Sequence, residues 1–245
     1  MMMTKLLWWR DAWFMRWAEG VSSGGTGLAT PSSSRLVCDI TTRVLHGLMA
    51  LSFVVAYVSA ESERWQLWHL AMGYLFLGAA LARVCWGLWG PRHAHAGQWR
   101  LRVQAAGRWV AKALKPEQWS WSHWSSVALM VLYVTVALLL LAVLPLTLSG
   151  VVSYEEWGPW WLVDGASALH EALGEAMLAL VLGHIAAVLA HGWLKRTPHW
   201  QRMFSGRLPG RGPDVSGDSA SVWALISVAA SVVLVTQVVS GNWLV

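Results

Sequence analysis

The sequence predicts an all-α membrane protein with a four-helix transmembrane bundle, a fifth transmembrane helix and interfacial amphipathic helices. Hydrophobic residues make up 56% of the chain and charged residues only 13%, which is too apolar for an ordinary soluble domain. The 20 tryptophans far outnumber the four tyrosines and four phenylalanines, and many of them flank apolar runs, as tryptophans do at membrane interfaces. We therefore expect one membrane domain of several spans.

Residues 1–38 are expected to form an interfacial helix followed by a flexible linker. Trp9, Trp13 and Trp17 recur at every fourth position and so share one helix face. The lysine and arginines among them fit a helix that lies in the membrane interface, and they make the segment a poor signal peptide. The following residues, 20–34, are rich in glycine, serine and threonine, which is typical of a linker.

Five apolar runs predict five transmembrane helices. We expect residues 39–211 to form the four-helix transmembrane domain, and residues 212–245 to form a linker and the fifth helix. Pro145 is expected to kink or end the third span, because proline removes a helical hydrogen bond. A basic stretch at residues 98–114 can form a second interfacial helix. The spans are expected at about residues 44–60, 65–89, 125–148, 170–193 and 222–243.

The positively charged residues lie almost entirely on one side of these spans. Of the 18 lysines and arginines, all but Arg64 and Arg83 lie in the N-terminal segment or in the connections after the second and fourth spans. The positive-inside rule therefore places the N-terminus on the inner side and, with five spans, the C-terminus on the outer side of the membrane. The predicted outer loop at residues 149–167 carries three acidic residues and no cation: Glu155, Glu156 and Asp164.

The fourth span carries His170 and His184, which are fourteen positions apart. At about 100° per residue, fourteen steps come within about 40° of whole turns, so both imidazoles lie on one helix face. The rise between them is about 21 Å, which is most of a hydrocarbon core of about 30 Å. Ionisable side chains at such depths are costly and usually functional.

The predicted topology sorts four histidines into two levels. His69 opens the descending second span, so it lies toward the outer side with His170; His46 opens the first span, so it lies toward the inner side with His184. Helix bundles build cofactor sites from facing helices, and haem iron with two imidazole ligands takes one from each face of the porphyrin. Two haems follow from this pattern, while a single haem or plain polar contacts between histidines remain open.

Three further residues are candidates near the inner level. Arg83 lies fourteen positions after His69, at the level of the inner histidines, and Arg43 lies three positions before His46. Either guanidinium can pair with a haem propionate, although both can also extend toward the inner headgroups. His191 can replace His184 as the partner of His46, contact a propionate, or face the headgroups, which we expect most.

The two cysteines, Cys38 and Cys85, argue against other redox cofactors. The sequence has no Cys-x-x-Cys-His motif for covalent haem and no cysteine cluster for iron–sulfur or zinc. Both cysteines fall on the predicted inner side, where a disulfide is not expected.

Several motifs resemble the bacterial cytochrome b561 and nickel–iron hydrogenase b-type cytochrome family. The similarity covers about residues 39–211. The fifth span and the tryptophan-rich N-terminus lie outside it, and the hydrogenase-type Gly-His-Asn-Pro motif is replaced here by Ser122-His123-Trp124-Ser125. The similar motifs are Thr42-Arg-Val-Leu-His46, His69-Leu-Ala-Met-Gly73, Ala82-Arg-Val-Cys-Trp-Gly87, Gly90-Pro-Arg-His-Ala94, Leu146-Thr-Leu-Ser-Gly150, His170-Glu171, His184-Ile-Ala186 and Arg202-Met-Phe-Ser-Gly-Arg207.

The resemblance implies a di-haem cytochrome with two non-covalent b-type haems in the bacterial cytoplasmic (inner) membrane, so we expect a cytoplasmic N-terminus and a periplasmic C-terminus. The implied iron ligands are the matching residues His46, His69, His170 and His184. We expect an electron-transfer subunit that connects a periplasmic partner, such as a c-type cytochrome, dehydrogenase or hydrogenase, to membrane quinone. A self-contained quinone-linked oxidoreductase acting on superoxide or quinol is the alternative, and a haem-free transporter or scaffold is a third. No nucleic-acid partner is expected.

Overall fold

The computed structural model describes residues 34–89, 121–197, 200–209 and 218–240. The two predicted interfacial helices, at residues 1–20 and 98–114, lie outside this part of the chain. All the described residues belong to one compact unit that begins at Ser34.

Five long apolar helices dominate the described residues, and each is long and apolar enough to cross a membrane. This finding confirms the predicted all-α membrane class. A single 3₁₀ turn, η1 (Glu63–Trp65), precedes the second helix. The long helices are α2 (Ile40–Ser59), α3 (Gln66–Trp89), α5 (Trp121–Tyr154), α6 (Trp160–Lys195) and α8 (Asp218–Val239).

Helix α2 begins four residues earlier than its apolar run predicted, because Asp39 caps it. One Asp39 carboxylate oxygen accepts a hydrogen bond from the backbone N–H of Thr42 at 2.7 Å, and the other accepts one from the Thr42 hydroxyl at 2.8 Å. A side-chain acceptor at the N-cap satisfies an N–H group that the helix itself leaves free.

The expectation that Pro145 ends the third span is wrong. Helix α5 contains Pro145 and continues to Tyr154, in a segment with a mean hydropathy of 2.9. Proline is tolerated inside membrane helices because neighbouring groups satisfy the backbone that it frees, whereas leaving this apolar segment without helical hydrogen bonds would be more costly.

The predicted outer loop at residues 149–167 is also mostly helical. Helix α6 begins at Trp160 and ends at Lys195, where Arg196 adopts a left-handed backbone with φ of 53°. The connection between α5 and α6 is therefore only residues 155–159. His170 and His184 lie near the middle of α6, with ten residues before the first and eleven after the second.

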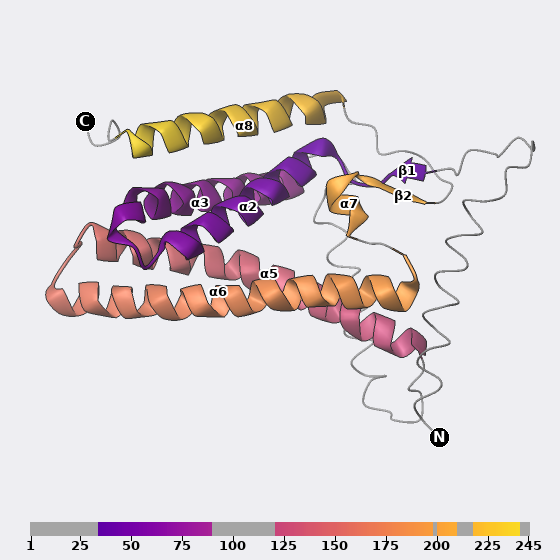
Figure 1. Cartoon of the computed structure of the whole chain (residues 1–245), viewed down its shortest axis with the longest axis horizontal. Coiled ribbons are helices and arrows are strands. Elements are labelled where there is room, and N and C mark those ends of the chain that lie inside the picture. Colours follow the sequence, from indigo (N-terminus) through magenta and orange to yellow (C-terminus); the bar gives the residue numbers. More distant parts are fainter. Residues whose placement is uncertain (1–33, 90–120, 198–199, 210–217, 241–245) are drawn as a thin grey trace, which may run out of the picture. The chain divides into compact units, whose positions relative to one another are not determined.

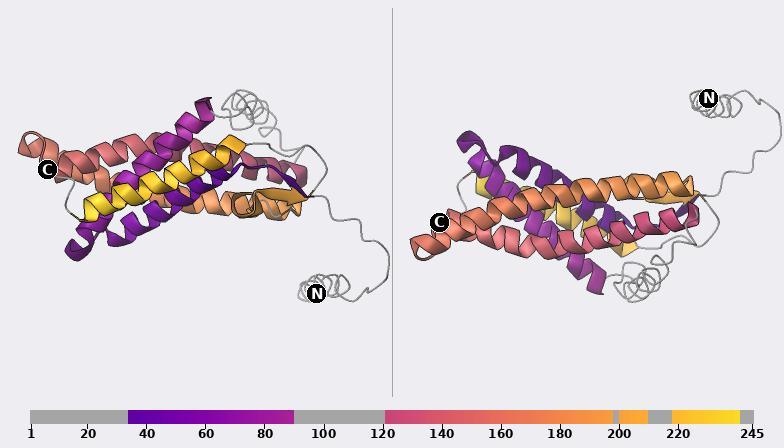
Figure 2. Two further views of the ribbon diagram at one scale, coloured as in Figure 1. Left: turned by 90° about the horizontal axis from the view of Figure 1, so that it is seen from above. Right: turned by 90° about the horizontal axis from the view of Figure 1, so that it is seen from below.

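The helices pack as two antiparallel pairs with one added helix. Helix α2 packs along α3, and α5 packs along α6. Helix α8 contacts α2 and α3 and lies on the side of them away from α5 and α6 (Figure 1; Figure 2). The buried core draws side chains from α2, α3, α5 and α6, as a four-helix bundle does; its members are Phe53, Phe76, Ala80, Val143, Leu146 and Met177.

A short antiparallel strand pair joins two segments that the sequence indicated as irregular. Strand β1 (Ser34–Leu36) precedes α2, and β2 (Arg207–Pro209) follows the short helix α7 (Gln201–Phe204). Three residues per strand give too short an alternation to be read from sequence.

Candidate functional site

Two histidines face each other between α3 and α6, and we call His69 and His170 the outer pair after their predicted side of the membrane. Their ring centres are 5.9 Å apart and their planes are nearly perpendicular, at 83°. His69 Nδ1 lies 2.8 Å from the Ala56 carbonyl oxygen, and His170 Nδ1 lies 2.8 Å from the Leu146 carbonyl oxygen. Because a carbonyl only accepts, both Nδ1 atoms carry the proton, which leaves each Nε2 lone pair for a metal.

The inner pair consists of His46 on α2 and His184 on α6. The ring centres are 6.4 Å apart and the planes are inclined by 41°. The Nδ1 atom of His184 is buried and has no hydrogen-bond partner among the described residues, which is uncommon for a buried polar atom. The structure thus brings the four predicted histidines together in the two predicted combinations.

Gly150 on α5 makes room for the outer pair, and sequence reasoning gave it no role. A Cβ atom at this position would lie 2.8 Å from both Nδ1 and Cε1 of His170, well inside the usual contact distance of about 3.5–4.0 Å. Only glycine therefore lets the imidazole reach the Leu146 carbonyl one turn earlier on α5. The sequence feature that could have indicated this role is the glycine at the end of the motif at residues 146–150.

The spacing of both pairs fits a metal bound between two imidazoles. Each metal–nitrogen bond is about 2 Å and each ring centre lies about 1 Å beyond its nitrogen, so the centres of two such rings are about 6 Å apart. No group of three or more His, Cys, Asp or Glu side chains suited to a metal occurs within the described ranges. Two protein ligands suit a metal whose remaining positions are filled by a macrocycle, as in haem.

Arg43 lies at the start of α2, and Arg83 lies in the second half of α3. Arg43 donates a hydrogen bond from a terminal guanidinium nitrogen to the Phe204 carbonyl oxygen at 2.9 Å, while its buried Nε has no partner among the described residues. Burial and the Asp39 carboxylate raise the pKa of the Cys38 thiol, and the nearby guanidinium groups of Arg202, Arg43 and Arg83 act against that rise. The start of α2 therefore has three guanidinium groups near it as well as the Asp39 carboxylate.

His191 does not belong to either pair. It is buried, with 8% of its surface exposed, and its Nδ1 donates to the Ser125 carbonyl oxygen on α5 at 2.9 Å. The expectation that it faces the headgroups is wrong, because α5 extends far enough to cover it. The structure places the ring of His184, and not that of His191, beside His46.

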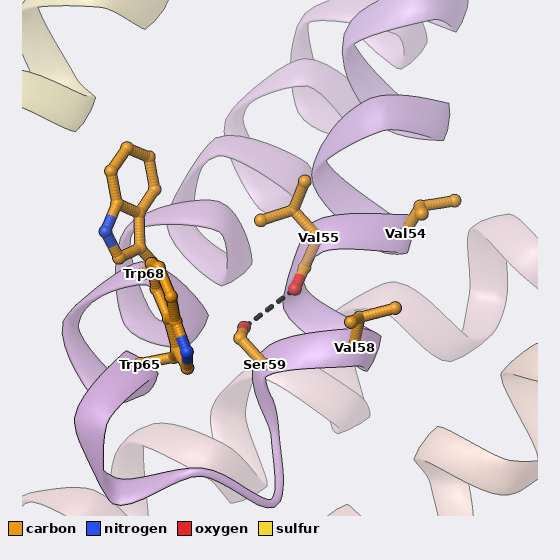
Figure 3. A pocket seen from close by; sticks show the side chains of 6 residues that line it. All are labelled: Val54, Val55, Val58, Ser59, Trp65 and Trp68. Atoms are coloured by element: carbon orange, nitrogen blue, oxygen red, sulfur yellow. Dashed lines mark hydrogen bonds between the residues drawn. The ribbon is translucent and has the colours of Figure 1, made fainter.

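An apolar groove lies at the end of α2 and the start of α3 (Figure 3). Its volume is about 420 Å³. The hydroxyl of Ser59 donates to the Val55 carbonyl oxygen of its own helix at 2.7 Å, so the lining is apolar and suits an acyl chain. The lining residues are Val54, Val55, Val58, Ser59, Trp65 and Trp68.

The fold and the two facing imidazole pairs define a class: multi-span helical membrane proteins with paired histidines on facing helices of one bundle. A family model described as prokaryotic cytochrome b561 matches residues 37–206. The chain therefore belongs to the prokaryotic cytochrome b561 family, and it is a membrane b-type cytochrome that binds b-type haem and takes part in electron transfer. Comparison with curated proteins found no match, and neither did comparison with solved structures.

Proposed function

We propose that this cytochrome holds two non-covalent b-type haems, one between His69 and His170 and one between His46 and His184. The observation that carries the proposal is the pair of ring separations, 5.9 Å and 6.4 Å, on facing helices. Haem supplies one-electron redox chemistry when it is bound. The bundle holds the two pairs about 21 Å apart along α6, and the Ala56 and Leu146 carbonyls orient the outer imidazoles.

The inner site is proposed to use positive charge as well. Arg83 lies near the buried start of α2, and a guanidinium there would pair with a propionate carboxylate. Arg43 is the second candidate, through its unpartnered Nε. Its terminal nitrogen is already engaged with the Phe204 carbonyl, so we assign the larger share of propionate binding to Arg83.

The proposed reaction is electron transfer between a periplasmic redox protein and the membrane quinone pool. The two imidazoles of each pair would leave no open position on a bound haem iron for a substrate, so the protein would pass electrons between its partners. Turnover of the isolated protein with quinone and a small oxidant, without any partner, would instead favour the self-contained oxidoreductase.

Purified protein is expected to contain two haems per chain, both removable by acid–acetone, because neither site has a Cys-x-x-Cys-His attachment motif. Pyridine haemochrome quantitation against protein mass measures the stoichiometry. A value of one haem, or haem that stays on the polypeptide after extraction, would contradict the proposal.

We propose that the N-terminus is cytoplasmic and the C-terminus periplasmic. The support is the concentration of lysine and arginine on one side of the five spans. Fusions after Val245 are therefore expected to be active with a periplasmic reporter only. Activity of a cytoplasmic reporter at this position would mean that α8 does not cross the membrane.

The acidic turn between α5 and α6 is proposed to attract a basic periplasmic partner. Glu155, Glu156 and Asp164 are exposed, and Asp164 lies at the start of α6. Attraction between exposed charges speeds encounter at low salt and is screened at high salt. The double substitution Glu155→Gln and Glu156→Gln is expected to slow stopped-flow reduction by the native partner, with the difference shrinking as salt rises. Unchanged rates would exclude this turn as the docking site.

A further inference from the structure

The start of α2 is held by the segment that follows α6. The backbone N–H groups of Val37 and Cys38 both donate to the Gly206 carbonyl oxygen, at 2.8 Å and 3.2 Å. Strands β1 and β2 continue this contact as an antiparallel pair, with Leu36 opposite Arg207 (Figure 1). We call residues 34–38 and 204–209, together with the Arg43 side chain, the clasp.

Gly206 is the one position in the clasp where no other residue fits without strain. Its φ is 73°, which is a left-handed conformation that L side chains rarely adopt. A Cβ atom would lie 2.9 Å from the Cys38 carbonyl oxygen and 3.0 Å from Arg43 Nε. The first of these atoms belongs to the backbone, so relief requires the two segments of the clasp to separate.

The side chain of Arg43, which lies on α2, connects this helix to the second segment of the clasp. Its guanidinium lies against Gly206 and donates to the Phe204 carbonyl oxygen across 161 residues of chain. The residues at the start of α2 are buried where the clasp joins it: Cys38, Asp39, Thr41, Thr42 and Leu45.

The clasp lies on one side of the inner pair along α2 and α6, and one further contact lies on the other side. Tyr57 on α2 donates to a Glu175 carboxylate oxygen on α6 at 2.9 Å. His46 lies between Arg43 and Tyr57 on α2, and His184 lies between Glu175 and the clasp on the other chain segment. The clasp on one side of the inner pair and the Tyr57–Glu175 hydrogen bond on the other therefore limit how far α2 can slide along α6.

We propose that the clasp is a positioning device that sets the distance and the ring angle between His46 and His184. The proposal rests on the proposed inner haem site. Imidazole orientation in metal sites depends on such supporting contacts, and their loss typically weakens metal binding about 10- to 100-fold. The outer pair is oriented at the other end of the bundle by the Leu146 carbonyl of α5 and by the Ala56 carbonyl of α2. Ala56 lies beside the Tyr57 contact with Glu175, which holds that end of α2, so loss of the clasp acts mainly on the inner pair.

The test is Gly206→Ala in the full chain, read by low-temperature EPR of the oxidised membrane protein. The g-values of a low-spin haem depend on the angle between its two imidazole planes, and His184→Ala identifies which signal is the inner one. We expect Gly206→Ala to shift or remove the inner signal and to leave the outer signal unchanged. General unfolding would instead weaken both signals together.

Gly158→Ala is the matched control. Gly158 also has a positive φ, 110°, and a Cβ there would lie 2.9 Å from a Leu162 side-chain atom, in the connection at the opposite end of the bundle. We expect this substitution to leave the inner signal unchanged. Equal effects of both substitutions on the inner signal, or an unchanged inner signal in Gly206→Ala, would overturn the clasp. A wild-type protein with one low-spin signal would overturn the two-haem function itself.

A disulfide across the clasp provides a second test if the Gly206→Ala protein does not accumulate in the membrane. Leu36 and Arg207 are directly opposed across the strands, and such pairs lie about 4.5–5.5 Å apart, within the range for a disulfide. In the triple variant Leu36→Cys, Arg207→Cys and Gly206→Ala, the oxidised form is expected to regain the inner signal, and the reduced and alkylated form to lose it. Identical inner signals in the two forms would contradict the proposal.

Discussion

Replacing His46 or His184 with alanine is expected to remove the same single haem, and replacing His69 or His170 is expected to remove the other. Each substitution deletes one of the two proposed ligands in its pair, which leaves a single imidazole at that proposed site. Haem content should fall from two to one per chain, and a redox titration followed by absorbance should lose one of its two components. The two members of a pair should lose the same component.

His191→Ala is the matched control for this series. His191 lies on the same helix as His184 but is bound to the Ser125 carbonyl on α5, so both redox components should remain. If His191→Ala removes the inner component and His184→Ala does not, then the assignment of the inner ligand on α6 is wrong. Loss of different components by His46→Ala and His184→Ala would contradict the pairing itself.

The pairing of the histidines was open to prediction because it depends on two regular quantities. The rise and angle per residue of an α-helix place His170 and His184 on one face at two depths, and the charge distribution sets the direction of each span. Neither quantity depends on where a helix begins or ends. The histidine pairs were therefore predicted correctly although α6 begins ten residues before the predicted start of the span.

The features that were missed depend on contacts between distant segments. Pro145 indicates a break by its local chemistry, but the apolar surroundings of α5 keep the helix continuous to Tyr154. The β1–β2 pair places Ser34 opposite Pro209 and Leu36 opposite Arg207, and a local sequence pattern cannot indicate so distant a partner. The role of Gly150 likewise requires knowing that the His170 ring lies against it.

Gly150→Ala is expected to have the second largest effect, and it should fall on the outer haem alone. The added methyl would lie 2.8 Å from two atoms of the His170 ring, so the ring must move by most of an ångström to reach an ordinary contact distance of about 3.5–4.0 Å. That movement breaks the hydrogen bond to the Leu146 carbonyl, which fixes the proton on Nδ1 and aims Nε2. Loss of such a supporting contact weakens metal binding about 10- to 100-fold, so most of the outer haem should be lost during purification.

Gly165→Ala separates this effect from the general consequences of placing alanine in a helix. Gly165 is exposed on α6, five residues before His170, and a Cβ there meets nothing within 4 Å. Alanine favours a helix over glycine by about 0.5–1 kcal/mol, so this variant should keep both haems and unfold no more easily than the wild-type protein. Redox titration and haem quantitation of the two variants side by side make the comparison. The inner pair lies about 21 Å away along α6, so Gly150→Ala should not affect the inner haem. Retention of the outer haem at the wild-type potential, or loss of both haems together, would show that His170 is not held against Gly150 in the way described.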